Sequence, residues 1–191
     1  MTDIDQGDIK LFLESNDSSA FERLLLKYQD KVYNFCCRYL GNEADASDCT
    51  QEIFIRVYQN LSGFRFEAKF STWLYRITLN TCKNMKSSKQ YRIQQRSIPI
   101  DPELTNNRQP TTNNGFNPEF QIQNKELNRL LQHAIDTLKG KQKTILILRD
   151  IEGHSYEEIA DITGLKPGTV RSTLNRARLK IAGKISKYLE R

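Results

Sequence analysis

Apolar residues recur along most of this chain with the 3.6-residue period of an α-helix. In the first half, the pattern predicts three long helices, which begin near Phe21, Asp45 and Ser71. In the second half, it predicts helices over about 125–138 and 141–151, followed by a pair of short helices. No stretch shows the alternation of apolar and polar residues that a half-buried strand requires. The expected fold class is therefore all-α.

The segment 96–122 interrupts this pattern. It is rich in Pro, Asn, Thr and Gln, and its four prolines prevent a continuous helix. Too few apolar residues remain in it to build a core. We therefore expect two small helical domains, residues 1–95 and 123–191, joined by a flexible linker at 96–122.

Residues 155–181 have the pattern of a helix-turn-helix. Ser155 precedes Glu158 by three residues, which is the spacing of a capping box at a helix start. Gly164 is suited to end that first helix, and Pro167 to begin the second. Four apolar residues then fall on one stripe of the second helix: Val170, Leu174, Ala177 and Ile181.

The other side of this second helix is polar and basic. Ser172, Asn175 and Arg176 point away from the apolar stripe, with Arg171 and Arg178 on one flank. These side-chain types hydrogen-bond to base edges in a DNA major groove. The pattern indicates either a DNA-reading helix or an ordinary amphipathic hairpin with a solvated basic face.

The charge is distributed in two basic blocks. The chain has a net charge of +6, while residues 46–96 carry +6 and residues 127–191 carry +6, with acidic segments outside them. Two separate basic blocks suggest two contacts along one polyanion, the alternative being chance clustering of solubilising charge.

The helix that begins near Asp45 combines an apolar side with an acidic strip. Asp45, Asp48, Gln51 and Glu52 lie three to four residues apart and so share one exposed face. An acidic surface repels nucleic acid, which makes a basic helical partner protein the suitable ligand. A plain solvated face is the alternative.

The helix from Ser71 to Tyr91 is basic on its outer side. It contributes to a run of cations without an acidic residue: Arg76, Lys83, Lys86, Lys89 and Arg92. Such a run suits contacts with the phosphate backbone, and Asn80 and Asn84 are available for base edges.

The segment just before that helix interleaves aromatic and basic residues. Phe64, Phe66 and Phe70 alternate with Arg65 and Lys69. The rings either form a stacking platform for unpaired bases or belong to the core. We assign the following Trp73 to the core.

The cysteines and histidines do not form a metal-binding motif. Cys36, Cys37, Cys49 and Cys82 include no C-x-x-C pair, and both histidines lie far away in the chain. We expect buried, reduced thiols at Cys36 and Cys82, no metal and no cofactor. The chain also shows no nucleophile motif, signal peptide or membrane-spanning run, so we expect a non-enzymatic, cytoplasmic protein.

Two sets of motifs resemble the sigma-70 superfamily of bacterial transcription factors. Asp45-Ala-x-Asp48-x-x-Gln51-Glu52-x-Phe54-x-Arg56 and Phe70-x-Thr72-Trp73-Leu74-Tyr75-Arg76-Ile77 resemble the core-binding and melting regions. Leu148-Arg149-x-x-Glu152-Gly153-x-Ser155-Tyr156-Glu157-Glu158-Ile159-Ala160, with Gly168-Thr169-Val170-Arg171-Ser172 and Arg176-Ala177-Arg178, resembles the fourth region. Because only these two regions and a linker are present, the chain is similar to the extracytoplasmic-function (ECF) group.

This resemblance implies a role for each set of residues. The first domain would bind the clamp helices of the largest RNA polymerase subunit and would recognise and melt the −10 element, while the second would bind the −35 duplex. The polymerase-binding residues would be Asp45, Asp48, Gln51, Glu52, Phe54 and Arg56. The −10 residues would be Phe64, Arg65, Lys69, Arg76, Asn80, Lys83 and Asn84. The −35 residues would be Arg149, Thr169, Arg171, Ser172, Asn175, Arg176 and Arg178.

The resemblance also implies partners. These are the flap of the second-largest polymerase subunit, promoter DNA and an anti-sigma factor that holds the protein at the inner membrane, with no small-molecule substrate. The chain departs from the family pattern at Leu138-Lys139, where Leu-Pro is usual, and at Thr173, where arginine is common. The alternative function is a stand-alone helix-turn-helix regulator, which predicts duplex binding without polymerase.

Overall fold

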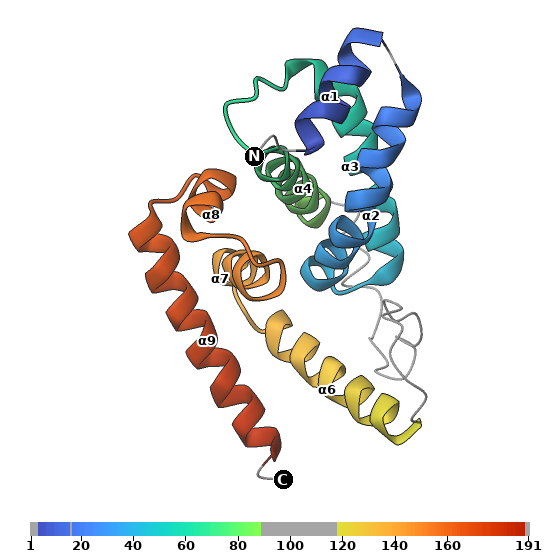
Figure 1. The fold of residues 1–191 in the computed structure, drawn as a ribbon. Coiled ribbons are helices and arrows are strands. Elements are labelled where there is room, and N and C mark those ends of the chain that lie inside the picture. The colour runs from blue at the N-terminus through green and yellow to red at the C-terminus, as the bar shows by residue number, and fades with distance from the viewer. Residues whose placement is uncertain (1–3, 16, 89–117, 190–191) are drawn as a thin grey trace. The chain divides into compact units, whose positions relative to one another are not determined.

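The computed structural model describes residues 4–15, 17–88 and 118–189, and every regular element in these ranges is helical (Figure 1). The all-α prediction is confirmed. The chain divides into two compact units, of which the first contains α1 to α4 and the second contains most of α6 to α9. Residues 96–117 of the predicted linker lie outside the described ranges. Within these ranges, the helices are too short or too polar to cross a bilayer.

The first unit is a bundle of four helices with one short 3₁₀ turn. Its elements are α1 (Ile4–Ser15), α2 (Ser18–Leu40), α3 (Glu43–Asn60), η1 (Leu61–Gly63) and α4 (Phe70–Ser87). α2 packs against α1, α3 and α4, and α3 also packs against α4. The apolar positions that predicted the helices form the core, including Val32, Phe35, Ile53 and Leu74, each fully buried.

α1 is an element that the sequence pattern did not reveal. Ile9 and Phe12 are buried against the unit, while Leu11 and Leu13 are exposed. Its carboxylate at Asp5 is buried, accepts a hydrogen bond of 2.6 Å from the Tyr28 hydroxyl and forms an ion pair with Lys27. This polar anchor attaches α1 to α2 where the apolar periodicity of α1 is short.

The turn between α2 and α3 follows the predicted chemistry. Gly41 ends α2 in the left-handed region at φ 79°, where a side chain would be strained. Asn42 then caps α3, because its side-chain oxygen accepts a hydrogen bond of 3.1 Å from the backbone N–H of Asp45. The close succession of C-cap and N-cap fixes where the surface of α3 begins.

The second unit contains α6 (Pro118–Asp136), α7 (Gly140–Leu146), a π turn η2 (Ile147–Ile151), α8 (Tyr156–Thr163) and α9 (Pro167–Leu189). α9 packs against α6 and α7. α6 begins at Pro118 and not near residue 125 as predicted, because proline is well tolerated in the first turn of a helix. The expected helix at 141–151 is present as α7 and η2, which run on without a break.

Candidate polymerase and nucleic-acid interfaces

The acidic strip is on the outer face of α3. Its inner positions, Ala46, Cys49, Ile53 and Val57, are fully or almost fully buried. Asp48 and Gln51 are exposed, and Asp45 and Glu52 are partly buried. The predicted separation of an apolar and an acidic face is therefore present.

Two interactions define the electrostatics of this strip. Glu52 accepts a hydrogen bond of 2.6 Å from Nε of Arg56, one turn later on the same helix. Partial burial raises the pKa of Asp45, and the Asp48 carboxylate contributes in the same direction. Carboxylates placed close enough to oppose each other's ionisation suit a surface that awaits a positively charged partner.

The basic face of α4 also lies where the sequence predicted it. Leu74, Tyr75, Leu79 and Cys82 are buried on the inner side of the helix. The four predicted −10 residues of α4 are exposed, namely Arg76, Asn80, Lys83 and Asn84. Lys89 and Arg92 lie outside the described residues.

The aromatic platform expected between η1 and α4 is not exposed as a whole. Phe64 is 6% exposed and Phe70 is 2% exposed. The ring of Phe64 has its centroid 4.9 Å from Phe66, 5.9 Å from Phe70 and 5.4 Å from Trp73. Phe64 is therefore part of the core, and the expectation that it offers a free face to a base is wrong.

The same segment does present cations around a small hollow. Arg65 and Lys69 are exposed, whereas Phe66 and Trp73 are partly buried. Phe66 has a left-handed φ of 59°, and Lys10 of α1 lies 5.8 Å from the centre of its ring. A hollow of about 170 Å³ is lined by Gly63, Phe64, Arg65, Glu67, Ala68, Trp73 and Arg76.

The helix-turn-helix has the predicted local structure. The Ser155 N–H donates to Glu158 at 2.8 Å, and the Glu158 N–H donates to the Ser155 hydroxyl at 3.1 Å, which completes the capping box. Gly164 ends α8 at φ 70°. The apolar stripe of α9 is buried at Val170, Leu174, Ala177 and Ile181.

The six predicted −35 residues of α9 are all exposed: Thr169, Arg171, Ser172, Asn175, Arg176 and Arg178. Arg176 donates from Nε to the Ser172 carbonyl oxygen at 3.3 Å. A hollow of about 320 Å³ on this face is lined by Tyr156, Gly168, Arg171, Ser172, Leu174, Asn175 and Arg178.

Tyr156 organises this face and was missed by the sequence analysis. The guanidinium of Arg149 lies 4.9 Å from the centre of its ring, and that of Arg171 lies 5.3 Å away. Arg149 also donates a hydrogen bond of 2.7 Å to the carbonyl oxygen of His154. Arg149 is thus a partly buried structural residue, as well as a predicted DNA contact.

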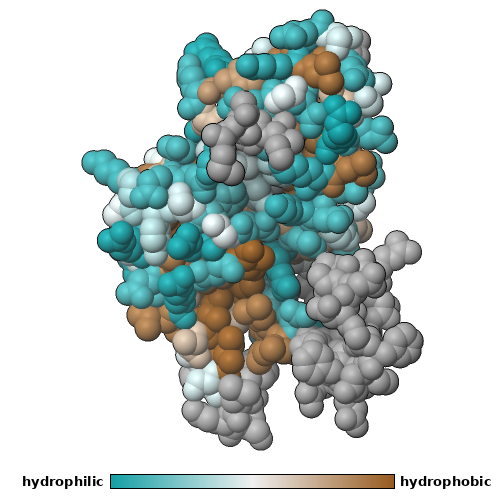
Figure 2. All heavy atoms as spheres, in the orientation of Figure 1, coloured by the Kyte–Doolittle hydropathy of each residue, from teal (hydrophilic) through white to brown (hydrophobic). Residues whose placement is uncertain are grey.

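An apolar surface lies elsewhere in the second unit. Leu127 of α6 and Leu179 of α9 are 57% and 67% exposed. Hydrophobic side chains gather on the face of this unit between these two helices (Figure 2). Exposed side chains of this kind are typical of surfaces that receive another protein.

Comparisons with known proteins agree on one family. Residues 24–92 match the model for sigma-70 region 2, and residues 128–181 match the model for sigma-70, region 4. An ECF RNA polymerase sigma-E factor of Haemophilus influenzae is 36% identical, with 91% of each chain covered. The sigma-E factor of Escherichia coli K12 is 34% identical, with 94% of this chain and 93% of the relative covered.

Solved structures show the same fold. CnrH in complex with the cytosolic domain of CnrY has a TM-score of 0.69 at 21% identity and covers 97% of this chain and 99% of its own. RpoE of Bartonella quintana, in complex with the anti-sigma factor NepR, has a TM-score of 0.65 at 20% identity and covers 87% and 96%. The two family matches and the sigma-E relatives do not favour the stand-alone regulator. The chain belongs to the ECF group of sigma-70 factors, which direct transcription initiation by RNA polymerase.

Proposed function

We propose that the two units divide promoter recognition between them. Residues 1–95 bind core polymerase and open the −10 element, and residues 123–191 bind the −35 element as duplex, with 96–122 as the linker. The observation that carries this proposal is the presence of an acidic strip on α3 and a basic face on α4 within one unit. One such unit has a surface for a basic protein and a separate surface for DNA.

The acidic strip is the polymerase contact in this proposal. Asp48 and Gln51 are exposed at its centre, and Phe54 is partly buried beside them. The carboxylates attract basic side chains of the clamp helices, and Phe54 supplies apolar contact area. The Arg56–Glu52 ion pair holds one edge of the strip in a fixed conformation.

The basic face of α4 is the −10 contact. Arg76, Lys83 and Asn80 are exposed on one side of a helix whose other side is buried, so the helix presents them together. The hollow beside Arg65 and Trp73 replaces the exposed platform as the place for an unpaired base. In this revised form, Phe64 supports the wall of the hollow from within the core.

The face of α9 is the −35 contact. Arg176 and Asn175 are the base-reading side chains, because both are exposed and Arg and Asn form bidentate bonds with guanine and adenine. Arg171 and Arg149 flank the Tyr156 ring, which limits the conformations that these long side chains lose on binding.

The remaining partners follow from the surfaces and the family. The apolar side chains between α6 and α9 receive the flap of the second-largest polymerase subunit. The two solved relatives are bound to CnrY and to the anti-sigma factor NepR, which supports an anti-sigma factor for this chain, one that holds it at the inner membrane. The protein acts in the cytoplasm, without catalysis and without a small-molecule substrate.

The test is reconstitution with purified core polymerase. The full chain is expected to form a complex with core and to direct transcription from a promoter that has both elements. Duplex containing only the −35 element is expected to bind the free protein weakly. Strong duplex binding without core, together with no complex with core, contradicts the proposal and favours the stand-alone regulator.

A further inference from the structure

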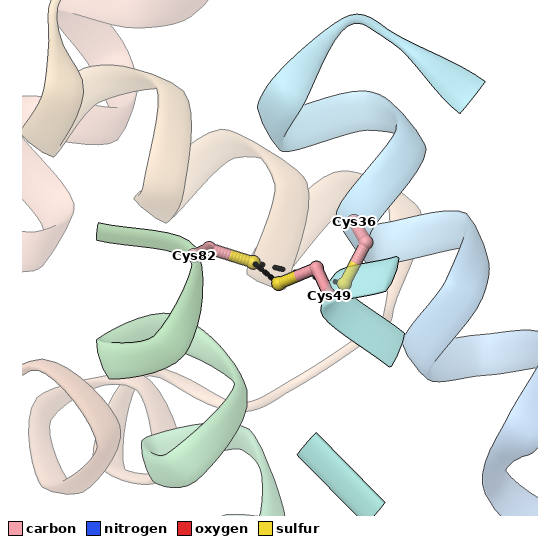
Figure 3. A group of neighbouring side chains, drawn as sticks. All are labelled: Cys36, Cys49 and Cys82. Atoms are coloured by element: carbon pink, nitrogen blue, oxygen red, sulfur yellow. Dashed lines mark hydrogen bonds between the residues drawn. The ribbon is translucent and has the colours of Figure 1, made fainter. Parts of the chain in front are cut away.

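Three of the four cysteines meet in the core of the first unit. Cys36 comes from α2, Cys49 from α3 and Cys82 from α4, and none of them is exposed to solvent (Figure 3). Sγ of Cys82 lies 3.6 Å from Sγ of Cys36 and 3.6 Å from Sγ of Cys49. All three sulfurs lie within 4.8 Å of one another, and all three thiols are free.

This triangle has the size of a metal site. Metal–thiolate bonds of about 2.3 Å in a planar, three-coordinate arrangement place the sulfurs about 4.0 Å apart. The two separations of 3.6 Å and the upper bound of 4.8 Å lie on either side of that value. Small shifts of the three side chains are therefore enough to centre an ion among them.

The composition of the cluster selects the ion. Structural zinc is almost always four-coordinate, whereas no fourth Cys, His, Asp or Glu of the described residues joins these three. Soft thiolate ligands select Cu(I) among the first-row metals that they bind. Because thiolates are the ligands, each coordinating sulfur releases its proton to solvent when the ion binds.

We propose that Cys36, Cys49 and Cys82 form a three-coordinate site for Cu(I). The bound ion joins α2, α3 and α4 in the core of the unit. α3 and α4 also carry the acidic strip and the basic face, so an occupied site makes the arrangement of these two surfaces more rigid. Because the sulfurs are fully buried, the ion enters through local opening of the helices and binds slowly.

The test uses the full chain, reduced and kept under anaerobic conditions. It is titrated with Cu(I) in competition with a chromophoric Cu(I) chelator. We expect one Cu(I) per chain, a thiolate-to-Cu(I) charge-transfer band in the ultraviolet, and a melting temperature that rises with Cu(I) concentration. X-ray absorption at the copper edge is expected to show three sulfur ligands.

Single variants identify the ligands. Cys36→Ser, Cys49→Ser and Cys82→Ser are each expected to weaken Cu(I) binding by about ten-fold or more. Cys37→Ser is the matched control, because Cys37 follows Cys36 in α2 but is not part of the cluster. Circular dichroism checks that each variant is folded.

The outcomes are decisive even if a serine variant unfolds, since the X-ray absorption measurement uses the unmodified chain. Two sulfur ligands, or nitrogen and oxygen ligands, overturn the proposal. An equal loss of affinity in Cys37→Ser also overturns it. Binding of Zn(II) in place of Cu(I) at matched free concentrations overturns the choice of ion.

Discussion

Arg178 of α9 is held by Asp150 of η2 through two hydrogen bonds, 3.0 Å from Nε and 2.5 Å from Nη2. Bidentate guanidinium–carboxylate pairs fix both position and orientation. The pair lies at the edge of the proposed −35 face, so a carboxylate there offsets one of its arginine charges. The positive charge offered to DNA is consequently concentrated at Arg171 and Arg176.

The first prediction concerns this pair. Asp150→Asn is expected to strengthen binding of any duplex sequence and to steepen the dependence on salt by about one counterion, because the Arg178 charge becomes available to a phosphate. Fluorescence anisotropy at several salt concentrations measures the effect. Glu157→Gln, which removes an exposed carboxylate from α8, is the control. An unchanged salt slope in Asp150→Asn would show that Arg178 does not reach the backbone.

The second prediction concerns the acidic strip. Asp48→Arg is expected to weaken binding to core polymerase and to leave the helix content unchanged, because Asp48 is exposed and its reversed charge repels a basic partner. Affinity for core is measured by competition with the unmodified chain, and helix content by circular dichroism. Glu22→Arg on the exposed side of α2 is the matched charge reversal. Equal binding by Asp48→Arg and the unmodified chain contradicts the assignment.

The third prediction separates two arginines of the second unit. Arg176→Ala is expected to cost about 1–3 kcal/mol at one base position of the −35 element, as for a bidentate contact with guanine. The measurement compares binding to a panel of single-base −35 variants. A loss of equal size for every sequence would make Arg176 a backbone contact instead.

Arg149→Ala is expected to behave differently from Arg176→Ala. It should weaken all −35 sequences alike and also lower the melting temperature, because it removes the hydrogen bond to the His154 carbonyl and the contact with the Tyr156 ring. A variant as stable as the unmodified chain would mean that these contacts do not support the turn. The melting curve is measured on the free protein, without DNA.

The fourth prediction concerns opening of the −10 element. Arg65→Ala combined with Lys69→Ala is expected to abolish transcription from linear double-stranded promoter, because both cations are exposed beside the hollow near Trp73. A template already melted across the −10 region should restore it. The same defect on both templates would assign the segment to packing.

Phe64 serves as the structural control for that experiment. Because its ring is buried against Phe66, Phe70 and Trp73, Phe64→Ala is expected to cost about 3–5 kcal/mol of stability. The loss should appear in thermal unfolding of the free protein and should be similar in its effect on both templates. Retained stability would mean that the ring is not part of the core.

The sequence predicted those features that depend on local patterns. The stripe that includes Val170 and Leu174 and the capping box at Ser155 follow from spacing along one helix, and both are present. The burial of Phe64 does not follow from spacing, because a ring in a short irregular segment is placed by its tertiary neighbours. The meeting of Cys36, Cys49 and Cys82 depends on how three helices pack, which no spacing within one helix encodes.

The π turn at Ile147–Ile151 has a consequence for insertions and deletions. Its closing bond runs from the Glu152 N–H to the Ile147 carbonyl oxygen at 3.0 Å, so this turn contains one residue more than an α-helical turn. Removing one residue here would regularise the helix, but it would rotate everything on one side by about 100° relative to the other. Asp150 would then turn away from Arg178. The π turn is therefore a position where chain length is constrained by geometry, even though a nearby surface loop of the same length would accept the change.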